Sequence, residues 1–318
     1  MKAFLKKAAF FGLTVLTYFS TTSIYNFTID PYGIFGNRRE FRAIRPNEHS
    51  LKTNFVLQNP QKFNSFLFSN SKGGVLHVNQ LNNSEDSWYN MTYSLGTPEE
   101  FYNSLLLLLE NGVQVNNIIL GMDEGVIYER TSSHENDASC KFVNLQQDKI
   151  QWEFLFLPIS IKKILGADLS KKYIEHDIYT DGNYYAHNAN EADCISHENL
   201  ELVDFPHAAP IQPLDFSSQI EILEKIRYLC WQKGIQLTFL VHPSSFENYV
   251  SSTERRMQFE YLLKTLENKG FKLFRPYGAK LMLMSPCYWL DKHHYTQNIG
   301  NVILQEYPKN WANDSIGQ

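Results

Sequence analysis

The fold is decided by the stretch Phe66-Leu67-Phe68-Ser69-Asn70-Ser71-Lys72-Gly73-Gly74, in which an apolar run ends abruptly in small polar residues and a glycine pair. This pattern is typical of a buried parallel strand that ends in a loop at the carboxyl edge of a sheet, where ligands of open α/β sheets bind. A serine in such a loop lies beside backbone N–H groups freed by a tight turn, so it can be a nucleophile with its own oxyanion donor. An ordinary serine-rich turn has the same local pattern, and only other segments can choose between the two.

A second informative segment lies near the C-terminus and reads Trp289-Leu290-Asp291-Lys292-His293-His294-Tyr295. The residues after it have helical spacing, and Thr296 is suited to cap that helix. Asp291 and His294 therefore lie in the loop just before a C-terminal helix. A D-x-x-H pair in this position can be a carboxylate that orients an imidazole, which takes a proton from a serine. Two polar loop residues with no shared task are the alternative.

Together, these segments resemble the SGNH (GDSL-like) hydrolase superfamily, in which a serine comes first, then a glycine, then an asparagine, and D-x-x-H comes last. The resemblance spans residues 55–305. Residues 69–72 take the place of the family's G-D-S-x, which makes Ser71 the aligned nucleophile. The second block resembles residues 89–97, with Asn90 inside it and Gly96 as the oxyanion-hole glycine, and the third resembles residues 118–123.

Three positions depart from the family pattern. Ser69 replaces the glycine of the first block, Asn70 replaces its aspartate, and Asp123 stands where the family has an asparagine donor. An ionised carboxylate repels an oxyanion instead of stabilising it. Asp123 is therefore either protonated or engaged in another task, or the site is not that of a standard esterase.

The resemblance implies a three-layer α/β/α parallel sheet of the SGNH or flavodoxin-like type, and acyl-ester chemistry at its carboxyl edge. Ser71 would attack the ester, His294 would accept the proton, Asp291 would orient the imidazole, and Gly96, Asn90, Asp123 and Asn70 would face the oxyanion or the substrate. The closer likeness is to membrane-anchored periplasmic proteins of bacterial envelope polysaccharide acylation. It implies an acylated polysaccharide or a small acyl donor as partner, and no metal or organic cofactor.

Two alternatives to that function stay open. One is a catalytically inactive protein of the same fold that binds polysaccharide or assists assembly. The other is a lipase that acts on membrane esters. A rival catalytic base, His242, follows another expected strand, although the proline after it and the absence of a nearby carboxylate in sequence favour a loop or substrate contact.

The N-terminus has the features of a membrane element. Lys2, Lys6 and Lys7 precede an apolar run over residues 8–25, which threonines and serines dilute. At about 1.5 Å per helical residue the run is long enough to cross the hydrocarbon core, and it lacks an A-x-A cleavage site. We therefore expect an uncleaved signal anchor over residues 1–26, with lysines in the cytoplasm and the rest of the chain in the periplasm.

The rest of the chain predicts a connector over residues 27–62 and one α/β domain over residues 63–310. Helices and strands alternate in a βαβ rhythm that favours a parallel sheet with crossover helices. The expected elements are a helix at 50–58, strands at 63–68, 118–120, 235–241 and 271–274, and helices at 98–111, 215–232 and 254–269. Residues 129–210 break the rhythm and are expected to form an insertion beside the active-site edge, with a helix at 160–171.

Composition excludes one class of function and leaves several details open. With 29 Lys and Arg against 34 Asp and Glu, the 318-residue chain has no nucleic-acid footprint. Four arginines at positions 38, 39, 42 and 45 can meet an anionic polymer or simply be solvated. Four cysteines in an exported chain permit disulfides, and Cys140–Cys194 would staple the insertion. His187, His197, Asp181 and Glu191 lack the spacing of metal ligands.

Overall fold

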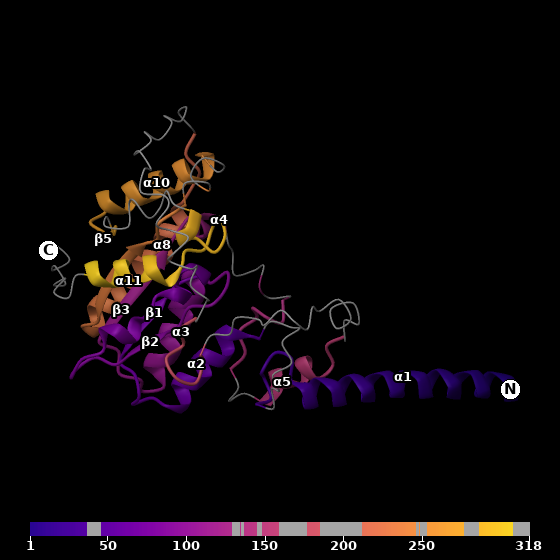
Figure 1. Ribbon diagram of the computed structural model, residues 1–318. Helices are drawn as coiled ribbons and strands as arrows, with labels where there is room; N and C mark the ends of the chain where they lie inside the picture. Colours follow the sequence, from indigo (N-terminus) through magenta and orange to yellow (C-terminus); the bar gives the residue numbers. More distant parts are fainter. Residues whose placement is uncertain are drawn as a thin grey trace. The chain divides into compact units, whose positions relative to one another are not determined.

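A computed structural model of the protein describes residues 1–36, 46–128, 134, 137–144, 148–158, 177–184, 212–245, 248, 253–276 and 286–307. The chain forms two compact units (Figure 1). The first consists of Met1–Asn54 and His134–Tyr173, and the second consists of Phe55–Ser133 and Ile174–Gln318. Part of the stretch expected to be an insertion therefore belongs with the N-terminal segment. The expected helix at 160–171, the arginine cluster and His187, Glu191 and His197 lie outside the described residues.

The first unit is built on helices α1 (Lys2–Ile29) and α5 (Asp148–Leu155), with the start of α2 (Glu48–Gln58). Asn26, near the end of α1, donates hydrogen bonds of 3.0 and 2.9 Å to the carbonyls of Leu155 and Leu157. A small apolar core consists of Ile34, Val143 and Phe154. The polar side chain of Asn26 is buried here because it satisfies two carbonyls that follow the last turn of α5.

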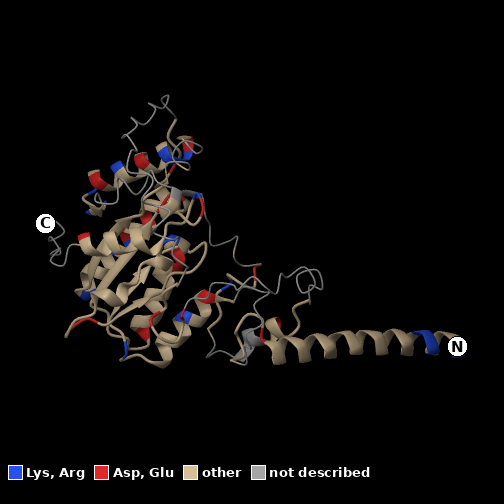
Figure 2. Cartoon of the chain, in the orientation of Figure 1, with Lys and Arg blue, Asp and Glu red and all other residues tan. Residues whose placement is uncertain are grey.

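The expectation of a membrane-spanning helix over residues 8–25 is corrected by the structure. Among the described residues, no helix is both long and apolar enough to cross a membrane. The physical reason in α1 is its polar content, since Ser20-Thr21-Thr22-Ser23 and Asn26 occupy its second half. The only charged residues of α1 are lysines in its first two turns. Figure 2 accordingly shows blue on this helix only near the N-terminus.

The second unit holds a five-stranded sheet in the order β2-β1-β3-β4-β5, with every pair parallel. The strands are β1 (Ser65–Phe68), β2 (Trp88–Asn90), β3 (Asn117–Met122), β4 (Gln236–Val241) and β5 (Leu273–Phe274). The expected parallel α/β fold is confirmed. The order is that of flavodoxin-like doubly wound sheets, whose connections reverse between β1 and β3. Ligands of such sheets bind at this reversal, outside the carboxyl ends of the strands.

Alternate strand residues enter two separate cores, so helical layers cover both faces of the sheet. Phe66, Ile118 and Phe239 point into one core, whereas Leu67 and Ile119 point into the other. Helices α3 (Pro98–Glu110), α8 (Ser217–Lys233) and α10 (Thr253–Asn268) cover the first face. Helix α11 (Gln297–Glu306) covers the second, together with the short helical turns η1 (Ser71–Val75) and η2 (Val78–Leu81).

Local signals set the helix ends where the sequence predicts them. Thr97 caps α3 in a reciprocal capping box with Glu100, and Gly234 ends α8 in the left-handed conformation at φ 69°. Thr296 occupies the N-cap position of α11 as expected, but its side chain makes no capping hydrogen bond. The remaining short elements are α4 (Gly125–Tyr128) and η6 (Pro286–Tyr288).

The expected disulfide between Cys140 and Cys194 does not form. Cys140 is buried and is not part of a disulfide bond, and the same holds for Cys230 on α8. Cys287 is disulfide-bonded, and its partner lies outside the described residues. The sequence favoured the wrong pairing because distances between loops depend on the tertiary fold and not on spacing along the chain.

Candidate active site

Three polar residues lie at one edge of the sheet because each directly follows a neighbouring parallel strand. Ser69 follows β1, Asp123 follows β3 and His242 follows β4. The strands are in register, with Phe68 opposite Leu120 and Leu120 opposite Phe239. Strands β3 and β4 end level with each other and β1 ends two residues earlier, so the three residues lie at the same edge of the sheet, where its connections reverse.

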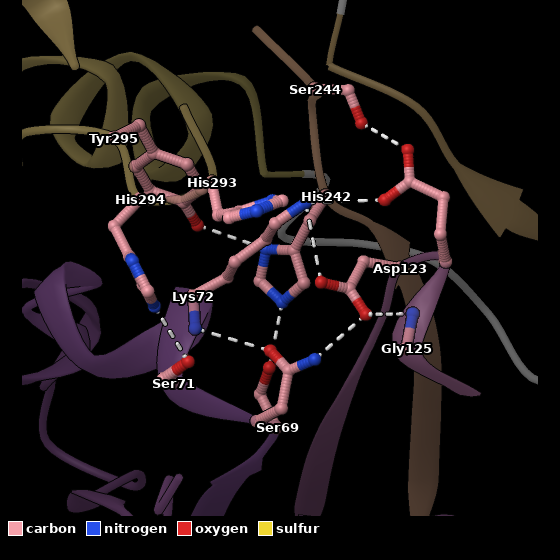
Figure 3. Close-up of polar contacts among 12 residues, drawn as sticks. Ser69, Ser71, Lys72, Asp123, Gly125, His242, Ser244, His293, His294 and Tyr295 are labelled. Carbon is pink, nitrogen blue, oxygen red and sulfur yellow. Dashed lines mark hydrogen bonds and ion pairs between the residues drawn. The ribbon is translucent and has the colours of Figure 1, made fainter. Parts of the chain in front are cut away.

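Ser71, His294 and Asp291 form a continuous hydrogen-bonded chain at this edge. The Oγ atom of Ser71 lies 2.8 Å from Nε2 of His294, and Nδ1 of that ring lies 2.8 Å from Oδ2 of Asp291 (Figure 3, which draws the serine and the histidine). With the carboxylate accepting from Nδ1–H, Nε2 is the basic nitrogen that faces the hydroxyl. The side chains of His294 and Asp291 are 37% and 55% exposed, so solvent and a substrate can reach them.

The loop that carries Asp291 and His294 is locally ordered. Trp289 and Tyr295 form an antiparallel bridge, and the N–H of Leu290 donates to the carbonyl of His294 at 2.7 Å. Asp291 Oδ1 accepts from the N–H groups of residues 293 and 294 at 2.7 and 2.8 Å. Burial alone would raise the pKa of Asp291, but the hydrogen bonds from His294 and from these two amides lower it below the usual value. Asp291 is therefore an ionised orienter of the imidazole.

A second serine–histidine pair lies beside the first and is buried. Ser69 Oγ is 2.7 Å from Nε2 of His242, whose Nδ1 is 2.9 Å from the hydroxyl of Tyr295. Burial lowers the pKa of His242 to about 3, although the charge of Asp123 opposes this shift. A base that weak takes a proton from a serine poorly at neutral pH. Ser69 is fully buried, so the structure favours Ser71 over Ser69 as the nucleophile, and His294 over His242 as the base.

Asp123 does not act as a donor towards an oxyanion, because both of its oxygens are engaged inside the protein. Oδ1 accepts from Asn70 Nδ2 at 2.7 Å and from the N–H of Gly125 at 2.8 Å, and Oδ2 lies 3.2 Å from the ammonium of Lys72. Burial would raise the pKa of Asp123, but the charge of Lys72 and the hydrogen bond from the N–H of Gly125 lower it below the usual value. Of the alternatives posed by the sequence, the structure selects an ionised Asp123 with another task.

Lys72 is a buried cation held by two carboxylates. Its ammonium lies 3.2 Å from Asp123 and 3.4 Å from Glu124, and all three side chains are less than a tenth exposed. Burial would lower the pKa of Lys72, but the two carboxylates raise it above the usual value. Ser244, after β4, donates to the other oxygen of Glu124. The cluster thus ties the loops after β1, β3 and β4 together (Figure 3).

No known protein identifies this site. No protein-family model matches the chain, and neither the curated proteins nor the solved structures contain a match. The site is therefore interpreted from its own geometry and from the motifs in the sequence.

Three further residues expected to face the oxyanion or the substrate have internal partners instead. Gly96 packs against the ring of Phe101, and its N–H donates to the carbonyl of Tyr93 at 3.4 Å. Asn90 is fully buried and donates to the carbonyls of residues 73 and 76, both at 3.0 Å, which supports the turn behind Ser71. Asn70 is half-buried, and its Oδ1 accepts from the N–H of Lys72 at 3.1 Å. The two asparagine side chains and the N–H of Gly96 make hydrogen bonds inside the protein and support the loop. None of them points an unused donor at Ser71.

Sequence reasoning missed the tasks of Ser69, Lys72, Glu124 and Tyr295. Their position in the sequence was the only available signal. Each of the four lies one or two residues from a residue that the sequence predicts for the site. Their partners are 52 to 173 residues away, so no local pattern reveals the contacts. In the part of the chain that the structure describes, no group of three His, Cys, Asp or Glu side chains is arranged to hold a metal.

Proposed function

We propose that this protein is a serine-dependent acyl-ester hydrolase or O-acyltransferase with Ser71 as nucleophile. The observation that carries the proposal is the chain from Ser71 Oγ to His294 Nε2, at 2.8 Å, and from His294 Nδ1 to Asp291 Oδ2, also at 2.8 Å. A nucleophile, a base within hydrogen-bond reach and a carboxylate that orients the base are the parts that acyl transfer through a covalent intermediate needs.

In the first half-reaction, Ser71 Oγ attacks the acyl carbonyl and its proton passes to Nε2 of His294. The tetrahedral intermediate collapses, the alcohol leaves with that proton, and the acyl group stays on Ser71. In the second half-reaction His294 takes a proton from water or from an acceptor hydroxyl, whose oxygen attacks the acyl carbonyl. The bond between the acyl group and Ser71 Oγ then breaks, and His294 returns the proton to that oxygen. Asp291 stabilises the imidazolium that forms in each step.

The oxyanion is expected to rely on the backbone N–H of Ser71. This residue begins η1, and N–H groups in the first turn of a helix have no acceptor inside the helix. The side chain of Asp123 and the N–H of Gly96 are engaged elsewhere. Loss of one oxyanion donor in a serine hydrolase slows turnover by about 10²–10³. We therefore expect slow turnover compared with a serine esterase that has a full set of donors.

The substrate class follows from the resemblance to SGNH hydrolases. In a domain with a parallel sheet, Ser71 follows β1 and the D-x-x-H loop precedes α11. This order along the chain agrees with that of the superfamily. The proposed substrate is an acyl ester on a polysaccharide hydroxyl, or a small acyl donor that supplies such an ester. Because the D-x-x-H loop is about half exposed, a bulky substrate can reach it more easily than it could enter a closed pocket.

The test is hydrolysis of p-nitrophenyl acetate together with labelling by a fluorophosphonate probe. We expect the wild-type protein to release nitrophenol and to carry the label on Ser71, located by peptide mass spectrometry. Ser71→Ala should abolish both, and His294→Ala should reduce both by at least about 10³, because subtilisin loses a comparable or larger factor without its base. Ser218→Ala on the exposed start of α8 is the matched control. Label on Ser69, or equal activity in Ser71→Ala, contradicts the proposal.

One observation favours a second candidate, a non-enzymatic protein that binds polysaccharide. Asp123 is an ionised carboxylate in the position of an oxyanion donor, and the N–H of Gly96 is occupied. A site that has lost both donors can keep its fold and bind an acylated polymer without turning it over. This candidate predicts retention on an acetylated polysaccharide column, equal for wild type and Ser71→Ala, with neither hydrolysis nor label.

A further inference from the structure

His242 bridges the two chain segments that carry the reacting residues. Its ring is buried at the end of β4, 3% exposed. On one side Nε2 meets Ser69 Oγ at 2.7 Å, and on the other Nδ1 meets the hydroxyl of Tyr295 at 2.9 Å. The first partner comes from the loop after β1 and the second from the segment before α11. These segments lie more than 200 residues apart in the chain.

Each partner of His242 is close in sequence to a reacting residue. Ser69 precedes Ser71 by two residues, and Tyr295 directly follows His294. The same two segments are therefore joined twice, once at the surface by Ser71 and His294 and once inside by the bridge through His242 (Figure 3). The surface contact is a single hydrogen bond between side chains that substrate must reach. The internal bridge is buried and out of contact with water, so it can hold the separation while the surface pair reacts.

The sheet is built to leave room for this bridge. Gly121 lies on β3, between β1 and β4. A Cβ at Gly121 would overlap His242 Nε2 and the Ser69 side chain. A Cβ at Gly73 would also lie within 3 Å of Ser69 Oγ. The hydrogen bond between Ser69 and His242 therefore passes over a strand position that only glycine leaves open.

We propose that His242 is a positioning residue that sets the separation of Ser71 and His294 by bridging Ser69 and Tyr295. The inference rests on the proposed function, since it assigns a role in that reaction. The groups that face His242 besides its two partners are the carboxylate of Asp123 and the ammonium of Lys72. Their opposite charges form an ion pair, and burial keeps His242 neutral, so the bridge needs no charge on the ring. His242 does not touch the reacting atoms and acts through its partners.

The experiment removes one arm of the bridge at a time and measures kcat and KM separately. Tyr295→Phe deletes a single hydroxyl, and we expect kcat for p-nitrophenyl acetate to fall about tenfold with KM nearly unchanged. His242→Leu deletes both arms, with an expected fall of about 100-fold, the loss that a displacement near 1 Å can cause. The double variant should be no slower than His242→Leu alone, because both changes break the same bridge. His242→Gln restores a donor and an acceptor and should recover part of the lost kcat.

Matched controls separate positioning from stability. Tyr89→Phe removes another fully buried hydroxyl, which donates to the carbonyl of Ile178 at 2.7 Å, and Ser65→Ala removes a buried hydroxyl at the other end of β1. Both should lower Tm about as much as the bridge variants do and leave kcat unchanged. If Tyr295→Phe keeps kcat within twofold of wild type, the positioning role is overturned, even where His242→Leu fails to fold. A wild-type protein without hydrolysis or label on Ser71 would instead overturn the proposed function itself.

Discussion

At the scale of single residues, burial separates two histidines, His294 and its rival His242, that the sequence offers as candidates for the base. His294 is partly exposed and paired with a carboxylate, whereas His242 is buried and paired with a phenol. Burial lowers the pKa of His242 to about 3, so its ring stays neutral at any pH at which the protein is expected to work. The same shift makes the folding stability depend on pH.

The sign of that dependence follows from proton binding in the two states. Between pH 6.5 and about 3 the unfolded chain protonates His242 and the folded protein does not, so stability falls as pH falls through this window. The expected loss is about 1.4 kcal/mol per pH unit well below pH 6.5. Urea unfolding of wild type and His242→Gln between pH 7 and 4.5 measures it, because the variant lacks this component. A stability difference between the two that does not change with pH contradicts the assignment.

At the scale of elements, Asp123 holds the loop between β1 and η1 from both sides of Ser71. Its Oδ1 accepts from Asn70 at 2.7 Å, and its Oδ2 pairs with Lys72 at 3.2 Å. The residues before and after the serine are thus fixed to one carboxylate, which itself is fixed by the N–H of Gly125. Asp123 is thus the anchor of the loop that carries Ser71, the proposed nucleophile.

Removal of either charge is expected to destabilise the protein, and removal of the cation should cost more. Lys72→Met leaves two buried carboxylates without their cation, which costs about 3–5 kcal/mol of the free energy of unfolding. Asp123→Asn should cost less, because Lys72 keeps its pair with Glu124. The double variant should lose less than the sum of the two, and urea unfolding of all four proteins gives the coupling. Asp123→Asn should also slow fluorophosphonate labelling of Ser71. Lys225→Met, which breaks an exposed i,i+4 pair on α8, is the control and should leave the urea midpoint nearly unchanged.

At the scale of the whole second unit, the site joins elements that the chain order keeps far apart. The loop that carries Ser71 follows β1, and the ion cluster draws on the ends of β3 and β4. His294, the proposed base, comes from the segment before α11. Helix α11 covers one face of the sheet through Ile299, Ile303 and Leu304. Packing of α11 on the sheet therefore places His294 at the sheet edge.

Ile299→Ala tests this dependence of the site on packing. Ile299 is fully buried, and truncation of such a side chain costs about 2–5 kcal/mol of the free energy of unfolding. We expect a lower urea midpoint and, under native conditions, slower labelling of Ser71 because the loop before α11 is held less firmly. Val302→Ala on the same helix, only partly buried, is the control and should affect both less. Normal labelling in a destabilised Ile299→Ala protein would show that α11 does not set the position of His294.

Predictions from sequence succeeded where the interactions are local. The apolar run before Ser69, the capping box at Thr97 and the glycine end of α8 each depend on residues within a few positions. The pairing of Asp291 with His294 is an i,i+3 contact inside one loop, so the D-x-x-H motif by itself predicts that these two side chains meet. The predictions failed where polar content or distant partners decide, as for α1, for Cys140 and for the oxyanion donor expected at Gly96.

The amino-acid sequence by itself determined the parallel α/β architecture, the limits of α2, α3, α8 and α10 to within two residues, and the identity of Ser71, Asp291 and His294 as candidates. Only the tertiary structure decided which serine meets which histidine, and that Asp123 is an anion held by Lys72. The physical reason is that charge and hydrogen-bond partners at this site come from strand ends that the register of the sheet brings together. Burial, which sets the pKa of His242 and Asp123, exists only once those strands and their covering helices have packed.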